Sequence, residues 1–391
     1  MTSTTRKHLS AAGLHRTILE AFRKVPDPRD KVRKQSISIT DHLMSGLAVF
    51  GLKCPSLLAF ERLRDDAATE TNLKGLYHVK NVPCDTHLRE RLDELDPQLL
   101  RPAFKKLFAS FQRGKGLERF EFMDGHVLIS GDGTGHFSSG KVSCPSCCEK
   151  KHRGGGVTYY HQMFGVCLVH PDIKGVVPLC PEPILKQDGS NKNDCERNAC
   201  KRFLQNFRRE HPHLKAILIQ DGLSSTAPHI RLIEESNLRY ILGAKPGDHE
   251  FLFHQLETSD QAQYHEEHAE DGSYHQFHFL NGASLNAANQ DLKVNVVDYR
   301  HTDAKGKERN FSWVTNIQIS AANAMKLATG GRARWKIENE TFNTLKNLGY
   351  NLEHNYGHGK KYLATIFCML MHAGLFDRPD STALLPAMGG V

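Results

Sequence analysis

Two short apolar segments, each closed by an aspartate and a glycine, constrain the fold of this chain more than any other feature. They are residues 128–133 (LISGDG) and 217–222 (ILIQDG). Continuous apolar runs bounded by turn residues predict strands that are covered on both faces of a sheet. Ligands bind at the carboxyl edge of the strands in an open α/β sheet. We therefore predict that the two strands are neighbours and that Asp132 and Asp221 meet at that edge.

Two adjacent carboxylates form a candidate site for a divalent metal. They repel each other, so one stays protonated unless a cation neutralises the pair. Mg²⁺ is the natural occupant, because it prefers oxygen ligands and keeps positions open for water and phosphate. The alternative interpretation is an ordinary Asp-Gly turn at the end of each strand.

The segments around Asp132 and Asp221 predict a mixed α/β sheet. Apolar runs bounded by proline or glycine predict strands at 126–132, 163–170, 175–180, 216–221 and 239–243. Between them, helices are predicted up to Arg209, with Asp194 as the N-cap, and at 228–236. The order strand, strand, strand, helix, strand, helix, strand indicates a sheet with helices on both faces.

A third carboxylate lies in a predicted helix with the sequence RWKIENETFNTLK, which begins at Arg334. Arg334 and Glu338 are one helical turn apart and share a face, so the guanidinium can hold the carboxylate in place. Glu340 is the rival candidate, and an ordinary surface ion pair is the alternative interpretation. The face expected to pack against the sheet is apolar and holds Trp335, Phe342 and Leu345.

The GDGTGHFSS stretch, the IQDG strand end and the RWKIEN helix occur in this order. Together they resemble the DDE transposases of bacterial insertion sequences, in the large group with a β-strand insertion before the glutamate. The resemblance covers nearly the whole chain and implies a ribonuclease H-like fold. It places the three catalytic, metal-binding carboxylates on Asp132, Asp221 and Glu338.

The resemblance also implies a reaction and its partners. Two Mg²⁺ ions, for which Mn²⁺ can substitute, would promote in-line displacement at DNA phosphorus without a covalent protein–DNA intermediate. The DNA would be the terminal inverted repeats of the element and its target. A homodimer or higher assembly would form on that DNA. Arg334 and Lys346 would hold the cleaved strand or orient Glu338.

Two positions depart from the signature of the group. Gly331 stands where the group has a tyrosine. Leu345 stands where it has a lysine, with Lys346 one residue later.

Changes in hydrophobic periodicity along the sequence divide the chain into a helical N-terminal part, a mixed α/β part, a stretch of short alternating strands and a second helical part. With the resemblance, these parts are interpreted as a DNA-binding domain, a catalytic core in two pieces and a β-rich insertion between the pieces. The predicted ranges are 1–118 for the helical domain, 119–245 and 321–378 for the core, 246–320 for the insertion and 379–391 for a tail. For the first range, a helical bundle with solvated charges is the alternative.

A cysteine cluster has the spacing of half a zinc site. It contains Cys144, Cys147 and Cys148, with His152 shortly after. The residues that could complete it in space are His136, Cys180 and Cys195. The alternative is a thiol cluster in a loop between two strands.

Three further residues are candidates for contact with DNA. Related transposases stack an aromatic residue on a flipped base, and Trp313 lies in the corresponding region, where core packing is the alternative. His354 and His358 follow the Glu338 helix and could contact phosphates, or they could be packed or solvated.

Charge and cysteine usage agree with this interpretation. The chain of 391 residues carries a formal charge of +7, which suits a polyanionic partner. Its ten cysteines indicate thiols or metal ligands in a reducing compartment, and we expect a cytoplasmic protein at the bacterial nucleoid, away from membranes. Two alternatives remain: a ribonuclease H-like nuclease without strand transfer, and an inactive DNA-binding protein derived from a transposase.

Overall fold

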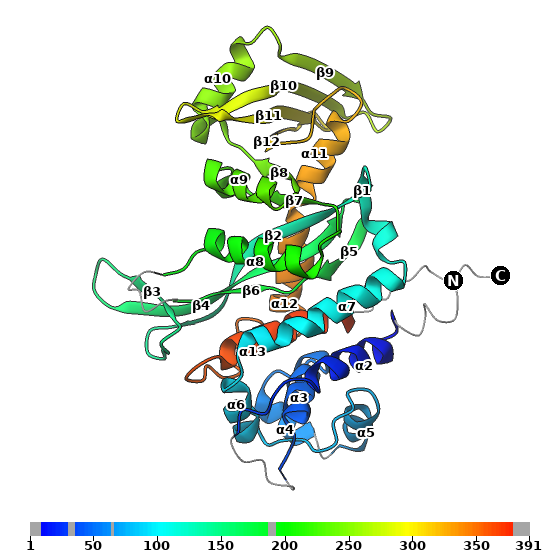
Figure 1. Cartoon of the computed structure of the whole chain (residues 1–391), viewed down its shortest axis with the longest axis vertical. Helices are drawn as coiled ribbons and strands as arrows, with labels where there is room; N and C mark the ends of the chain where they lie inside the picture. The colour runs from blue at the N-terminus through cyan, green and yellow to red at the C-terminus, as the bar shows by residue number, and fades with distance from the viewer. Residues whose placement is uncertain (1–8, 30–35, 64–65, 187–192, 378–391) are drawn as a thin grey trace, which may run out of the picture.

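One long mixed sheet runs through the molecule (Figure 1). The computed structural model describes residues 9–29, 36–63, 66–186 and 193–377. Within these residues the sheet has twelve strands, in the order β3-β4-β2-β7-β8-β12-β11-β10-β9, with β1 beside β2 and with β5 and β6 beside β4. The strands are β1 (Glu121–Met123), β2 (His126–Ser139), β3 (Cys148–Lys151), β4 (Val157–His170), β5 (Ile173–Pro178), β6 (Glu182–Ile184), β7 (Ala216–Gln220), β8 (Arg239–Gly243), β9 (Gln263–His268), β10 (Tyr274–Asn286), β11 (Asn289–Thr302) and β12 (Glu308–Thr315).

The two strands that end in the predicted aspartates are neighbours, as expected. β2 pairs with β7 in parallel up to the partners Ser130 and Ile219, and β7 pairs in parallel with β8. The predicted mixed α/β architecture is confirmed. One difference is that β2 does not end at Asp132 but continues beside β4, where Asp132 faces Gly165.

Helices cover both faces of the sheet at β4. Phe164 packs against Phe203 of helix α8. A side chain at the next position, Gly165, would instead collide with Phe342 from the segment that carries Glu338. Because successive residues of a strand point to opposite faces, α8 and this segment lie on opposite sides of the sheet.

Helices from the beginning and the end of the chain pack together, and further helices lie between the strands in sequence. The helices are α2 (Ala11–Phe22), α3 (Ile39–Gly51), α4 (Leu57–Leu63), α5 (Ala67–Gly75), α6 (Asp85–Asp93), α7 (Arg101–Arg113), α8 (Glu196–Glu210), α9 (Ala227–Glu235), α10 (Glu250–Thr258), α11 (Ala324–Arg332), α12 (Asn343–Asn347) and α13 (Leu363–Gly374). Short 3-10 turns lie at Pro97–Leu100, Leu117–Phe120, Gly222–Ser224, Pro246–Asp248 and Leu375–Asp377, and a π-helical segment at Ile337–Phe342. The C-terminal helix α13 packs against α3 and α6 of the N-terminal helices (Figure 1).

A buried charge cluster joins the N-terminal helices to the sheet. Arg101 of α7 donates to Glu182 of β6 over 2.5 Å and to Glu210 of α8 over 2.8 Å. Only 6% of the Arg101 side chain and 1% of the Glu182 side chain are exposed. Charges this deeply buried must be paired, so the cluster fixes where α7 sits on the sheet.

Two local predictions were wrong. Asp194 is not the N-cap of α8, because the helix begins at Glu196 after Cys195, and the Asp194 carboxylate accepts a hydrogen bond from Arg202 instead. Trp335 does not pack against the sheet, since it is 52% exposed, whereas the other two residues of that predicted face, Phe342 and Leu345, are buried.

The β-rich stretch between β8 and α11 extends the main sheet, because β12 pairs antiparallel with β8. The predicted tail, 379–391, lies outside the described residues. In the described part of the chain, no helix has both the length and the apolar character needed to cross a membrane.

Candidate active site

Asp132 and Asp221 line one cleft of about 610 Å³ at the point where β7 ends. Asp132 lies on β2, two residues beyond the last parallel pairing with β7, and Asp221 directly follows β7. The Asp221 carboxylate accepts from the backbone N–H of Leu223 over 3.1 Å, which holds it at the start of a 3-10 turn. The two predicted aspartates therefore line the same cleft.

Glycines on either side of Asp132 make room for the site. A Cβ at Gly131 would lie 2.6 Å from the Phe164 ring, and a Cβ at Gly133 would lie 2.1 Å from a carboxylate oxygen of Glu196. The absence of a side chain at Gly133 therefore lets Glu196 approach Asp132.

Glu196 is a candidate site residue that the sequence prediction missed. It lies in the first turn of α8 and lines the same cleft as Asp132 and Asp221. Burial raises its pKa, and the nearby charge of Asp221 adds to this effect. Glu196 lies at the start of the helix that precedes β7, and this position was the signal that the sequence offered. The sequence prediction placed Asp194 at the start of that helix instead.

Asp132 carries the most perturbed carboxyl group of the cleft. Burial raises the pKa of Asp132 to about 6, and the charges of Glu196 and Glu338 act in the same direction. The N–H of Gly133, which donates to Asp132 over 2.8 Å, and the charge of Arg334 oppose the increase. A buried carboxyl group with crowding acidic neighbours is the environment that a bound cation would stabilise.

Arg334 connects Asp132 to Glu338. Its Nη1 atom donates to Glu338 over 2.7 Å and to Asp132 over 3.3 Å. The hydroxyl of Ser130 donates to the Arg334 carbonyl over 3.1 Å, which ties this helix segment to β2. Neither Glu338 nor Arg334 is among the residues that line the cleft. The predicted one-turn pairing of Arg334 with Glu338 agrees with the structure.

The remaining predicted site residues lie elsewhere. Lys346 forms an ion pair with Glu353 over 2.7 Å and does not line the cleft. Trp313 is 6% exposed, and its ring lies so close to Gly331 that a Cβ there would be 2.5 Å away. Its burial fits the alternative of core packing rather than stacking on a base. It also gives the reason why position 331 has no room for a large side chain.

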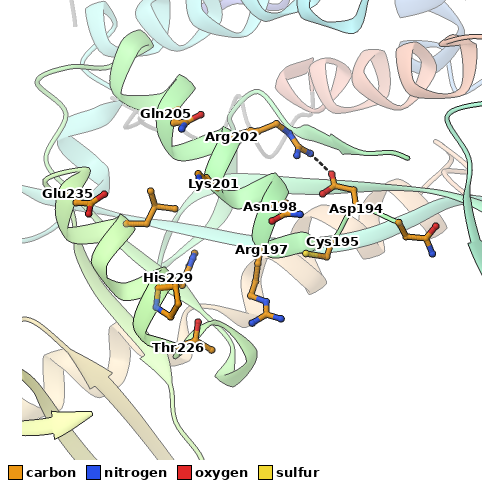
Figure 2. A pocket seen from close by; sticks show the side chains of 13 residues that line it. Asp194, Cys195, Arg197, Asn198, Lys201, Arg202, Gln205, Thr226, His229 and Glu235 are labelled. Carbon is orange, nitrogen blue, oxygen red and sulfur yellow. Dashed lines mark hydrogen bonds and ion pairs between the residues drawn. The ribbon is translucent and has the colours of Figure 1, made fainter. Parts of the chain in front are cut away.

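A second, basic groove opens beside the cleft (Figure 2). It has a volume of about 1030 Å³, lies between α8 and α9, and shares Arg197 and Thr226 with the cleft. Arg197 and Lys201 are exposed on its wall, whereas Arg202 is held by Asp194. The exposed carboxylate of Glu235 lines the same groove.

The cysteine cluster is completed by residues that the sequence prediction did not choose. Cys144, Cys147, His161 and His358 present four ligand atoms within 4.8 Å of one another. The predicted Cys148 and His152 are not in the set. The Cys148 thiol faces the Ile184 carbonyl, and His152 faces the Thr158 hydroxyl. The proposed completing residues, also outside the set, were His136, Cys180 and Cys195.

No protein-family model and no curated protein matches the sequence.

Proposed function

We propose that this chain is a DDE-type DNA transposase with a ribonuclease H-like core. The observation that carries the proposal is the pair Asp132 and Asp221 at the end of β7, with Glu338 linked to Asp132 through Arg334. The chain order β2, β4, β5, α8, β7, α9, β8 supports the fold assignment. It is the order of strands and helices that the resemblance to the transposases implies.

The carboxylates of Asp132, Asp221 and Glu196 offer the oxygen ligands that a divalent cation prefers. Among the described residues, however, the one set of three or more ligand atoms within 4.8 Å of one another is that of Cys144, Cys147, His161 and His358, so a cation would have to draw the carboxylates together. Asp132, Asp221 and Glu338 would hold Mg²⁺ or Mn²⁺, and Glu196 would supply a further carboxylate. Bound metal would activate the attacking water or 3′-OH and stabilise the leaving oxygen. Glu338 would join Asp132 around the metal once Arg334 turns its guanidinium toward a DNA phosphate. In the structure Arg334 contacts Glu338 over 2.7 Å and Asp132 over 3.3 Å.

The basic groove between α8 and α9 would accommodate the DNA strand that enters the cleft. Arg197 and Lys201 would contact phosphates and position the strand without reading its sequence. Neutralising these charges would weaken binding uniformly and lower its dependence on salt. Pairing of two DNA ends would require at least two copies of the chain.

A strand-transfer assay tests the proposal. The substrate is a linear DNA that carries the sequences flanking the encoding gene, incubated with Mg²⁺ and a supercoiled target. We expect joined products from the wild type and none from Asp132→Ala or Glu338→Ala. Glu340→Ala is the matched control and keeps activity, because Glu338 is the carboxylate that shares Arg334 with Asp132.

Two results would replace the proposal by an alternative. Cleavage without joining, still dependent on Asp132, would indicate a ribonuclease H-like nuclease. DNA binding without cleavage by any protein, in Mg²⁺ or Mn²⁺, would indicate an inactive transposase derivative.

A further inference from the structure

We infer that Cys144, Cys147, His161 and His358 bind one structural Zn²⁺ ion. The two cysteines belong to the loop between β2 and β3, His161 belongs to β4, and His358 lies between α12 and α13. The inference is independent of the proposed function, because none of the four residues lines the acidic cleft.

The distances between the ligand atoms match those around a tetrahedral zinc. Bonds of about 2.3 Å to sulfur and about 2.0–2.1 Å to nitrogen place neighbouring ligand atoms roughly 3.3–3.8 Å apart. The two Sγ atoms of Cys144 and Cys147 are 3.8 Å apart, and each lies 3.4 Å from His161 Nε2. His358 Nε2 lies 3.2 Å from both Cys147 Sγ and His161 Nε2.

The orientation of His358 suits a metal ligand. Its Nδ1 lies 2.9 Å from the Gly359 carbonyl, which can only accept, so Nδ1 carries the proton. In the neutral ring, Nε2 is then unprotonated, and its lone pair faces Cys147 and His161. A hydrogen bond from the second ring nitrogen to a carbonyl is the arrangement that orients histidine ligands of zinc.

Burial and ligand type select the metal. His161 is 2%, Cys147 1% and His358 7% exposed, so three of the four ligands are shielded from solvent. Two thiolates and two imidazoles in a closed set suit Zn²⁺, whereas Mg²⁺ requires oxygen ligands. Four protein ligands leave no open position, which is typical of a structural site.

The zinc would fasten the segment that follows the Glu338 helix. On one side His358 would be bound through the metal to β4. On the other side the backbone N–H groups of Lys360 and Leu363 donate to the Asp93 carboxylate of α6 over 2.8 and 3.0 Å. The metal would thus fix the segment between α12 and α13, which links the sheet to the N-terminal helices.

Metal content of the purified full-length protein tests the inference. We expect one zinc per chain, measured by atomic emission after dialysis, and less than one tenth of that in Cys144→Ser and His358→Ala. Matched controls that should keep their zinc are Cys195→Ser and His354→Ala, which change exposed residues outside the set. Asp132→Ala should also keep its zinc, which separates this site from the acidic cleft.

A second measurement needs no variant and so does not depend on how well a variant folds. Wild-type protein stripped by a chelator and loaded with Co²⁺ should show the visible absorption of tetrahedral thiolate coordination. Hydrogen exchange on stripping should increase around residues 140–147 and 352–362, with β10 and β11 as the internal reference. Wild-type protein without zinc and without the cobalt spectrum, or with a Cys144–Cys147 disulfide in its place, would overturn the inference.

Discussion

Removing the negative charge of Asp132 is expected to stabilise the metal-free protein at neutral and alkaline pH. Burial raises the pKa of this carboxyl group to about 6, from 3.8. The folded state therefore holds the proton more tightly than the unfolded chain does. Ionised Asp132 costs stability above pH 6, and the cost declines as the pH falls and disappears near pH 3, where both states are protonated. A difference of about two pKa units corresponds to about 3 kcal/mol.

The substitution Asp132→Asn isolates this effect. Asparagine keeps an oxygen that can accept from the Gly133 N–H and loses only the long contact of 3.3 Å with Arg334. In urea denaturation with a chelator present, we expect the variant to be about 2–3 kcal/mol more stable than the wild type at pH 8. The difference should shrink as the pH falls through 6 and vanish near pH 3. Asp172→Asn, at a side chain that is 86% exposed, is the control for simple loss of surface charge.

Added metal should reverse the order of stability. At 100 times its dissociation constant, Mn²⁺ would stabilise the wild type by about 2.7 kcal/mol and leave Asp132→Asn nearly unchanged. A metal-free variant that is less stable than the wild type at pH 8 would refute the reasoning, because it would mean that Asp132 is favourably ionised in the folded state.

Three further substitutions test other contacts. Glu196→Gln should weaken Mn²⁺ binding measured by calorimetry, and an unchanged affinity would place Glu196 outside the metal site. Arg101→Met should lower the free energy of unfolding in urea by about 3–5 kcal/mol, because it leaves Glu182 buried without its partner; a loss under about 1 kcal/mol would contradict a structural role for the cluster. Gly331→Ala should cost about 1–3 kcal/mol by thermal and urea unfolding, because its methyl group meets the Trp313 ring, and equal stability would show that the ring can move aside.

The pairing of β2 with β7 was predictable because residues 128–133 and 217–222 are both apolar segments closed by Asp-Gly. The continuation of β2 beyond Asp132 was not, because the glycines there resemble a turn. In the folded chain these glycines remain in the strand. Phe164 and Glu196 occupy the space that side chains at these positions would need. Local sequence cannot show what approaches a glycine from another element.

The zinc ligands illustrate the same limit. The spacing of Cys144 and Cys147 indicated half a site, but the other half comes from β4 and from a loop 211 residues after Cys147. Proximity in sequence favoured Cys148 and His152, whose side chains face other partners. Only the tertiary fold decides which histidines converge on a thiol pair.

The pairing of β12 with β8 has a consequence for any attempt to shorten the chain. Deleting the whole stretch between β8 and α11 would expose the N–H and carbonyl groups of β8 as a new open edge, which invites pairing between copies and aggregation. A shortened protein should retain β12 and β11, so that the backbone groups of β8 stay paired. Removal of β10 would in turn open the edge of β11, so β9, which already forms the edge of the sheet, is the strand that can be removed first.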